Sequence, residues 1–196
     1  MGSPRNVAVL VFDDVEVLDF CGPFEVFSVT GRREDLDLFH AYTVAERPAA
    51  VAARGGLAVL PAYTLADAPP ADVLVIPGGF GTRREMNNAA LVAWVRDAAA
   101  RAELVLSVCT GALILARAGL LDGLQATTHH GALDLLESVA PETRVRRDRR
   151  IVDNGRIVVS AGISAGIDAA LHVVAKLHGR DRALETARYM EYDWSA

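Results

Sequence analysis

The chain has 196 residues, of which 52% are hydrophobic and 23% are charged, and its formal net charge is −5 at pH 7. These values are typical of one globular domain over residues 1–196, and they give no overall attraction to nucleic acid or to an anionic membrane surface. No apolar run reaches the roughly 18 residues of a membrane-spanning helix, and the N-terminus lacks the layout of a signal peptide. We therefore expect a cytoplasmic protein with no membrane or nucleic-acid partner.

Apolar runs and turn residues predict alternating strands and helices in the first half of the chain. The predicted elements are a buried strand at 6–12, a helix at 18–29 with Pro23 in its first turn, a strand at 36–45 and a hairpin around Gly55 and Gly56.

The same alternation continues to the end of the chain. The predicted elements are a strand and glycine-rich loop at 71–81, a helix at 89–102, a strand at 103–108, a helix at 110–121 that closes near Gly119, a short strand and helix within 124–139, a hairpin at Asn154-Gly155, and helices at 163–179 and 181–192.

This order predicts an α/β fold with a mostly parallel sheet and helices on both of its faces. Such sheets place ligand sites at the carboxyl ends of their strands. The functional residues should therefore lie in Asp13–Cys21, Gly78–Gly81 and Cys109–Gly111.

Cys109 stands where a strand stops and a helix begins, with Ser107 two residues before it and Gly111 two residues after it. This pattern resembles a nucleophile elbow in which cysteine replaces serine. The helix N-terminus predicts a lowered pKa for the thiol. The alternative is that Cys109 is a small buried residue of the core.

Backbone N–H groups near Cys109 are candidates for stabilising charge on a bound substrate. The N–H of Thr110 follows the cysteine directly, and Gly78 and Gly79 follow a neighbouring strand. Glycine after a strand is also common in an ordinary turn.

A nucleophilic thiol requires a group that handles protons. Carboxylates of Asp13, Asp14, Glu16 and Asp19 follow the first strand, and His129 and His130 follow the elbow helix. Asp19 fits either an acid beside the thiol or a residue that satisfies N–H groups at a helix start. His129 is either a residue of the site near the thiol or a polar residue that ends a strand.

Only two cysteines are present, Cys21 and Cys109, and neither belongs to a pattern with metal-ligand spacing. Free thiols in a reducing compartment are expected, with no metal and no organic cofactor. Cys21 either lines the site or packs in the core.

Four ordered segments resemble the ThiJ/PfpI superfamily, which is related to class I glutamine amidotransferases. They are "VEVLDFCGPFEVF", "VLVIPGGFG", "SVCTGALILARAGLLDGLQATTHH" and "SAGISAGIDAALHVVAKL". The resemblance implies a flavodoxin-like sandwich, usually a homodimer, and the L-D-x-x-G-P, C-T-G and T-T-H segments are most similar to those of members that hydrate isocyanides.

The resemblance also implies residue roles. Cys109 matches the nucleophile and Asp19 matches the acidic residue beside it. Thr110 matches the residue after the nucleophile, Gly78 and Gly79 match the glycine-rich loop, and His129 matches a residue near the nucleophile.

Two departures narrow the activity that the resemblance implies. Thr110 stands where protease-like and glyoxalase-like members usually carry histidine, and no H-x-E pair of a glutaminase is present. Because the sequence ends at "MEYDWSA", we also expect no DNA-binding domain of the kind that regulatory members carry.

The resulting hypothesis is a cysteine-dependent lyase that hydrates an isocyanide to an N-substituted formamide without a cofactor. The alternatives are a redox or ligand sensor that uses the same thiol, and glyoxalase-like activity on small carbonyls.

The stretch 144–150, "RVRRDRR", contains five arginines in seven residues. Because no aromatic residues interleave and the chain is otherwise acidic, a solvated face is the preferred interpretation over an anion-binding surface.

Overall fold

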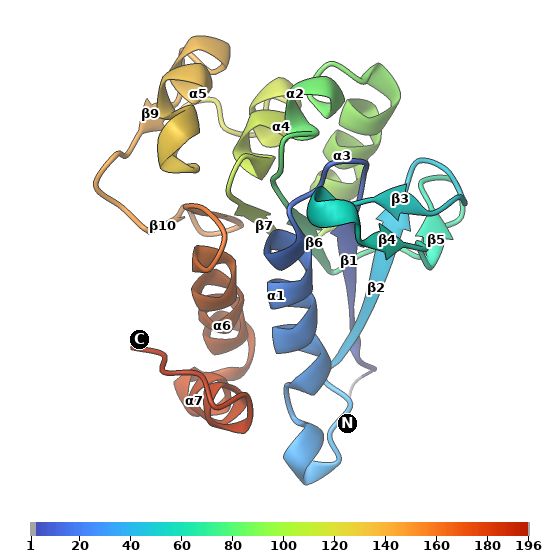
Figure 1. Ribbon diagram of the computed structural model, residues 1–196. Helices are drawn as coiled ribbons and strands as arrows, with labels where there is room; N and C mark the ends of the chain where they lie inside the picture. The colour runs from blue at the N-terminus through green and yellow to red at the C-terminus, as the bar shows by residue number, and fades with distance from the viewer. Residues whose placement is uncertain (1–2, 196) are drawn as a thin grey trace.

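The computed structural model describes residues 3–195, and its centre is a seven-stranded sheet (Figure 1). All neighbouring strands run parallel except the antiparallel pair β10–β11, which confirms the mostly parallel sheet. In order across the sheet, the strands are β10 (Ile151–Asp153), β11 (Ile157–Ser160), β7 (Leu104–Val108), β6 (Val73–Ile76), β1 (Arg5–Leu10), β2 (Phe39–Ala45) and β5 (Tyr63–Thr64).

The central strands form because their residues are apolar and often β-branched, which suits a sheet buried on both faces. Every residue of β6 and β7 is buried, as are the last four residues of β1. Val9 of β1 lies opposite Thr43 on one side and Val75 on the other, which fixes the register at the centre.

Helices cover both faces of this sheet. Figure 1 shows α1 and α6 side by side on one face with α7 packed against α6, and α3 and α4 pack together on the other face. The helices are α1 (Val17–Val29), α2 (Thr82–Glu85), α3 (Ala89–Arg101), α4 (Gly111–Arg117), α5 (Leu133–Val139), α6 (Ala165–His178) and α7 (Arg180–Tyr189), with short 3-10 turns η1 (Arg32–Glu34), η2 (Arg54–Gly56) and η3 (His130–Ala132).

Two small pairs of strands lie outside the main sheet. β3 (Val51–Ala52) and β4 (Ala58–Val59) are antiparallel around Gly55 and Gly56, which confirms the predicted hairpin. β8 (Gln125–Ala126) pairs in parallel with β9 (Arg144–Val145).

The helix that follows β1 differs from its prediction in the place of one proline. Pro23 lies inside α1 and not in its first turn, because the helix already begins at Val17. Proline has no N–H, so residue 23 makes no helical hydrogen bond to the carbonyl of Asp19. The loss is offset by tertiary packing, because Pro23 is buried and lies close to Gly166 of α6. A Cβ added to Gly166 would be only 3.6 Å from the proline ring.

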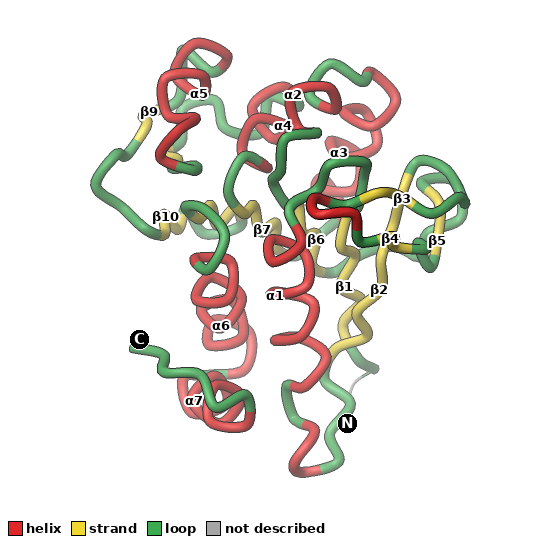
Figure 2. The backbone as a smooth tube through the Cα atoms, in the orientation of Figure 1, coloured by secondary structure: helices red, strands yellow, loops and turns green. Residues whose placement is uncertain are grey.

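The loops that follow β1, β6, β7 and β11 leave the sheet at one edge because these strands are parallel. In Figure 2 these loops, drawn in green, lie near the start of α1. The segments that the sequence selected around Asp19, Gly78 and Cys109 therefore meet at this edge.

Candidate functional site

Cys109 sits on a sharp turn between β7 and α4 with a φ of 56°. A residue with a Cβ pays a strain cost in this left-handed region, so the turn must be held by its surroundings. The Cys109 N–H points at the carbonyls of Ser160 (3.1 Å) and Ala161 (3.2 Å), and the hydroxyl of Thr128 donates to the Cys109 carbonyl at 2.7 Å. This geometry is that of a nucleophile elbow.

Small residues allow the elbow to approach its neighbours. A Cβ on Gly78 would lie 2.5 Å from the Thr110 nitrogen and 2.8 Å from the Cys109 Cβ, and a Cβ on Gly111 would overlap the carbonyl oxygen of Ile76. Ser107, below the elbow, is buried, and its hydroxyl has no hydrogen-bond partner within residues 3–195. The glycines are thus required by close backbone contact.

The carboxyl group of Asp19 lies fully buried beside the thiol. Its Oδ2 accepts a hydrogen bond from the Gly78 N–H at 3.0 Å, whereas Oδ1 has no partner of good hydrogen-bond geometry in the described part of the chain. A buried carboxyl oxygen without a partner is costly. Asp19 is therefore not explained as a helix cap, which was the alternative role for it.

Burial raises the pKa of Asp19 to about 7, with a smaller contribution from the nearby Glu16 carboxylate. The Cys109 thiol and the N–H groups of Gly78 and Ile163 oppose that rise. A carboxyl group with a pKa near neutrality can both accept and donate a proton at physiological pH.

The pKa of the Cys109 thiol is raised, so the predicted lowering of this pKa by the helix N-terminus is wrong. Burial is the main cause and the negative charge of Asp19 adds to it, while the N–H groups of Thr110 and Ile163 act in the opposite direction. The side chain is only 5% exposed, and desolvation outweighs the helix N-terminus.

The glycine-rich loop is bound to the elbow through Thr110. The Gly79 N–H donates to the Thr110 hydroxyl at 3.0 Å, and that hydroxyl donates back to the Gly79 carbonyl at 3.0 Å. Both glycine N–H groups are therefore occupied, Gly78 by Asp19 and Gly79 by Thr110. This corrects the expectation that they face the substrate, because buried donors pair with the nearest acceptor.

Thr110 and Ile163 instead supply the N–H groups that act on the sulfur. Ile163 was not selected from the sequence, although it lies in the quoted segment "SAGISAG". Ile163 has a φ of 55°, a left-handed conformation that is rare for a β-branched residue. Its side chain is also partly open to solvent, with 37% exposure. This backbone outlier is visible only in the structure.

A cleft of about 410 Å³ opens next to the elbow. Cys109 and Asp19 do not line this cleft themselves. Its lining includes His129 and three residues that contact or act on Cys109, which are Thr128, Ala161 and Ile163. Its volume is in the range of small-molecule sites.

His129 lies at this cleft with its ring against Gly162, where a Cβ would overlap the imidazole. Its Nδ1 accepts from the Gly131 N–H at 3.1 Å, so the neutral ring carries its hydrogen on Nε2. Burial lowers the pKa of His129, as do the neighbouring His130 and Arg83. The structure thus supplies a neutral donor at the cleft.

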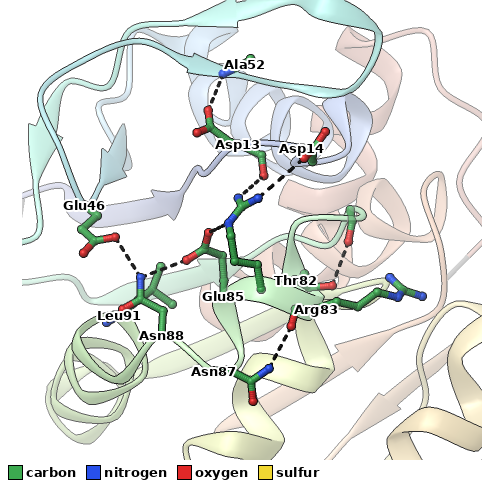
Figure 3. Close-up of polar contacts among 12 residues, drawn as sticks. Asp13, Asp14, Glu46, Ala52, Thr82, Arg83, Glu85, Asn87, Asn88 and Leu91 are labelled. Atoms are coloured by element: carbon green, nitrogen blue, oxygen red, sulfur yellow. Dashed lines mark hydrogen bonds and ion pairs between the residues drawn. The ribbon is translucent and has the colours of Figure 1, made fainter.

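The remaining candidates lie farther from the thiol. Asp13 accepts a hydrogen bond from the Ala52 N–H, and Asp14 forms an ion pair with Arg84 (Figure 3). Both carboxylates therefore take part in contacts outside the thiol site. Cys21 is two residues after Asp19 on α1, a spacing that points the two side chains in different directions, and it packs against the core.

Most of the arginine stretch is exposed and several of its arginines form ion pairs, but Arg147, Arg149 and Arg150 also line the cleft beside the elbow, so the stretch is not only a solvated face. Arg146 pairs with Asp148, Arg147 with Asp134 and Glu137, and Arg150 with Asp168. In residues 3–195 no three His, Cys, Asp or Glu side chains are placed to hold a metal ion, and no helix has the length and apolarity to cross a membrane.

The fold and the site define a class of α/β proteins with a mostly parallel sheet, a cysteine on a strand–helix elbow and a buried acid beside it. The model of the DJ-1/PfpI family matches residues 5–176, and the chain belongs to this family.

Similar proteins differ in their described roles. The chain is 35% identical over 187 residues to isonitrile hydratase of Pseudomonas putida, covering 95% of this chain and 78% of that protein. It is 30% identical over 178 residues to the HTH-type transcriptional regulator CdhR of Pseudomonas aeruginosa, covering 91% of this chain but only 52% of the regulator.

Solved structures agree with the fold. A ThiJ/PfpI family protein from Pseudomonas syringae superposes with a TM-score of 0.88 at 33% identity, covering 100% of this chain and 78% of that one. DJ-1beta of Drosophila melanogaster superposes with a TM-score of 0.83 at 19% identity, covering 97% of this chain and 100% of that one.

Proposed function

We propose that this protein is a cysteine-dependent hydratase that converts an isocyanide into an N-substituted formamide. The observation that carries the proposal is the buried Asp19 carboxyl, which has the Cys109 thiol beside it, a pKa raised to about 7, and one oxygen without a hydrogen-bond partner in residues 3–195. The similarity to isonitrile hydratase supports the choice of substrate.

The raised pKa values of Cys109 and Asp19 suit a mechanism in which one proton is passed between them. In the first step the S–H proton moves to the Asp19 carboxylate as sulfur bonds to the terminal carbon of R–N≡C. Asp19 then returns the proton to that carbon, which gives the thioimidate Cys–S–CH=N–R. A thiol with a high pKa can react because its base accepts the proton during the attack.

Water enters in the second half of the reaction. The Asp19 carboxylate accepts a proton from a water molecule as its oxygen bonds to the thioimidate carbon, and Asp19 passes that proton to nitrogen. The C–S bond of the resulting Cys–S–CH(OH)–NH–R then breaks as the hydroxyl proton moves to sulfur. The products are R–NH–CHO and the free thiol, so the overall reaction adds one water to the isocyanide.

Other groups near the thiol or at the cleft have supporting roles in this proposal. The N–H groups of Thr110 and Ile163 stabilise negative charge on sulfur, and the Nε2–H of His129 is available to the substrate. Gly78 and Gly79 hold Asp19 and Thr110 in place.

The test is a turnover assay with an alkyl isocyanide, with formamide measured by chromatography. We expect formamide from the native protein, none from Cys109→Ala, and an undiminished rate from the matched control Cys21→Ala. Consumption of methylglyoxal with the isocyanide left intact would replace the proposal with a glyoxalase-like activity. Oxidation of Cys109 at low peroxide without turnover of either compound would favour a sensor.

We also propose that the chain acts as a single domain that forms a homodimer. The family resemblance supports the dimer, and so do large apolar side chains that the single chain leaves open to solvent, such as Phe80 at 64% exposure and Leu60 at 73%.

A further inference from the structure

The cleft beside the elbow has a wall that is rich in cationic hydrogen-bond donors. Its lining includes three arginines and two histidines, and no Asp or Glu side chain of residues 3–195 belongs to it. The five side chains are those of Arg147, Arg149, Arg150, His129 and His130. Such a wall favours a ligand that brings hydrogen-bond acceptors and a negative charge.

Two of the three arginines are held by carboxylates that lie outside the cleft lining. Arg147 Nη2 donates to Asp134 Oδ1 and to Glu137 Oε2 at 2.8 Å. Arg150 Nε donates to Asp168 Oδ2 at 2.7 Å. These ion pairs hold two guanidinium groups at the wall but also use part of their charge.

Arg149 is the arginine with the most capacity for a ligand. Its Nε lies 3.6 Å from Asp148 Oδ2, which is longer than a hydrogen bond. Both oxygens of Asp148 already accept from Arg146, at 3.1 and 3.0 Å. The Arg149 guanidinium therefore keeps its donors available, and their planar fork fits a carboxylate.

A buried hydroxyl is independent evidence for a ligand in this cleft. Thr127 lines the cleft and is only 2% exposed, yet its hydroxyl has no hydrogen-bond partner within residues 3–195. This hydroxyl is not sealed in the core as that of Ser107 is, so the small exposed part of Thr127 opens to the cleft. An unpaired polar group at a buried position is costly, and an acceptor on a ligand would satisfy it.

The cleft is continuous with the thiol site. Three of its lining residues, Thr128, Ala161 and Ile163, contact or act on the cysteine of the elbow. An isocyanide with its terminal carbon at the sulfur therefore has room for its R group in this cleft. The donors described above then face the part of the substrate that does not react.

We propose that the R group of the substrate carries a carboxylate, which binds to the guanidinium of Arg149 and the hydroxyl of Thr127 while the isocyanide carbon lies at Cys109. This inference rests on the proposed hydration, because it names the class of isocyanide that the protein accepts. The substrates are isocyano carboxylates and the products are the corresponding formamido carboxylates.

The first experiment compares each substrate with an uncharged partner of nearly the same shape. The substrates are isocyano carboxylates whose chains have one, two or three methylene groups, each measured beside its primary amide. For the chain length that reaches Arg149, we expect the kcat/KM of the carboxylate to exceed that of the amide roughly tenfold, the effect of one charge-assisted hydrogen bond. The difference should appear in KM, because this contact is the same before and during the reaction.

Variants then locate the contact. In Arg149→Gln and in Thr127→Val, the ratio of the two kcat/KM values, carboxylate over amide, should fall toward one. Arg149→Lys retains the charge and Thr127→Ser retains the hydroxyl, so each should recover part of the ratio. Arg101→Gln is the matched control, because Arg101 is exposed at the end of α3, at the opposite edge of the sheet from the elbow, and it should leave the ratio at its native value.

A binding measurement requires no turnover. Calorimetric titration of the full chain with the formamido carboxylates and with their amides should show tighter binding of the carboxylates, and Arg149→Gln should lose this preference. The same preference without hydration of any isocyanide would reject the proposed function while still supporting a carboxylate site at Arg149.

Equal kcat/KM values for carboxylate and amide at all three chain lengths would overturn the inference. A ratio that both Arg149→Gln and Thr127→Val leave unchanged would overturn it as well. In either case, hydration of the neutral amides would still support the proposed function, so the two failures are distinguishable.

Discussion

At the scale of single residues, the pair formed by Cys109 and Asp19 shows how burial determines chemistry. Each group by itself has an ordinary pKa, but the low-dielectric surroundings disfavour a negative charge on either one and raise both values. The pair therefore holds a proton near neutrality, which is the property that a thiol addition followed by hydrolysis requires.

Replacing Asp19 should affect chemistry more than folding. Asp19→Asn retains an oxygen that can accept from the Gly78 N–H, so the fold should persist, and turnover of an isocyanide should fall by roughly 10²–10⁴-fold, the usual value of positioned acid–base catalysis. Steady-state formamide production measures this, with the exposed Asp122→Asn as the matched control. An unchanged rate in a folded Asp19→Asn protein would remove Asp19 from the mechanism.

The same variant should change how stability depends on pH. The pKa of Asp19 rises from 3.8 in the unfolded chain to about 7 in the folded one, so the folded state binds this proton more tightly. Its contribution to stability is complete below pH 3.8 and is lost as pH rises through 7. The free energy of unfolding of the native chain minus that of Asp19→Asn should therefore decrease between pH 4 and pH 8, by on the order of 4 kcal/mol.

Urea unfolding of both proteins at several pH values gives this difference, and taking the difference removes the titration of all other groups. A difference that stays constant with pH would show that the Asp19 carboxyl is not desolvated in solution.

At the scale of elements, the site depends on segments that come from distant parts of the sequence. The antiparallel hairpin β10–β11 places Ser160 and Ala161 beside the elbow, and their carbonyls accept from the Cys109 N–H. A hairpin thus helps to hold a strained residue that belongs to another strand.

The turn of this hairpin should be sensitive to the loss of its glycine. Gly155 has a φ of 85° with open space around it, so Gly155→Ala meets no steric contact but must adopt a left-handed conformation. Chemical denaturation should show a loss of about 1–2 kcal/mol. Gly155→Asn should lose less, because asparagine tolerates this conformation. Equal stability of the alanine variant and the native chain would contradict the backbone argument.

At the scale of the whole molecule, one continuous core extends across the central strands and the helices on both faces. The polar sites are confined to the carboxyl edge of the sheet, where the chain leaves the core and side chains have room to differ. Large apolar side chains outside this core, including Leu57, Leu60 and Phe80, are exposed, which is compatible with the proposed homodimer.

Light scattering should therefore report a dimer, with twice the chain mass of 20.9 kDa, or about 42 kDa. If the proposed dimer is stable, dilution should leave this mass unchanged down to low micromolar protein. A mass near that of the single chain at every concentration would exclude the dimer.

The sequence by itself determined most of the main elements and their order, although it did not predict the short elements β5, α2 and β9. Apolar runs marked β1, β6 and β7, Asn154-Gly155 marked a hairpin, and the change from strand to helix marked Cys109 as an elbow, because each of these signals is local and depends on side-chain polarity or backbone freedom over a few residues. The ordered family motifs added Asp19 for the same reason, since they are contiguous.

Only the tertiary structure decided the properties that depend on burial and on distant partners. It reversed the predicted pKa of Cys109, moved Pro23 into a helix interior, assigned the N–H groups of Gly78 and Gly79 to Asp19 and Thr110, and brought Ile163 to the thiol. Desolvation and long-range hydrogen bonds arise only when the chain closes on itself, so no local pattern of residues encodes them.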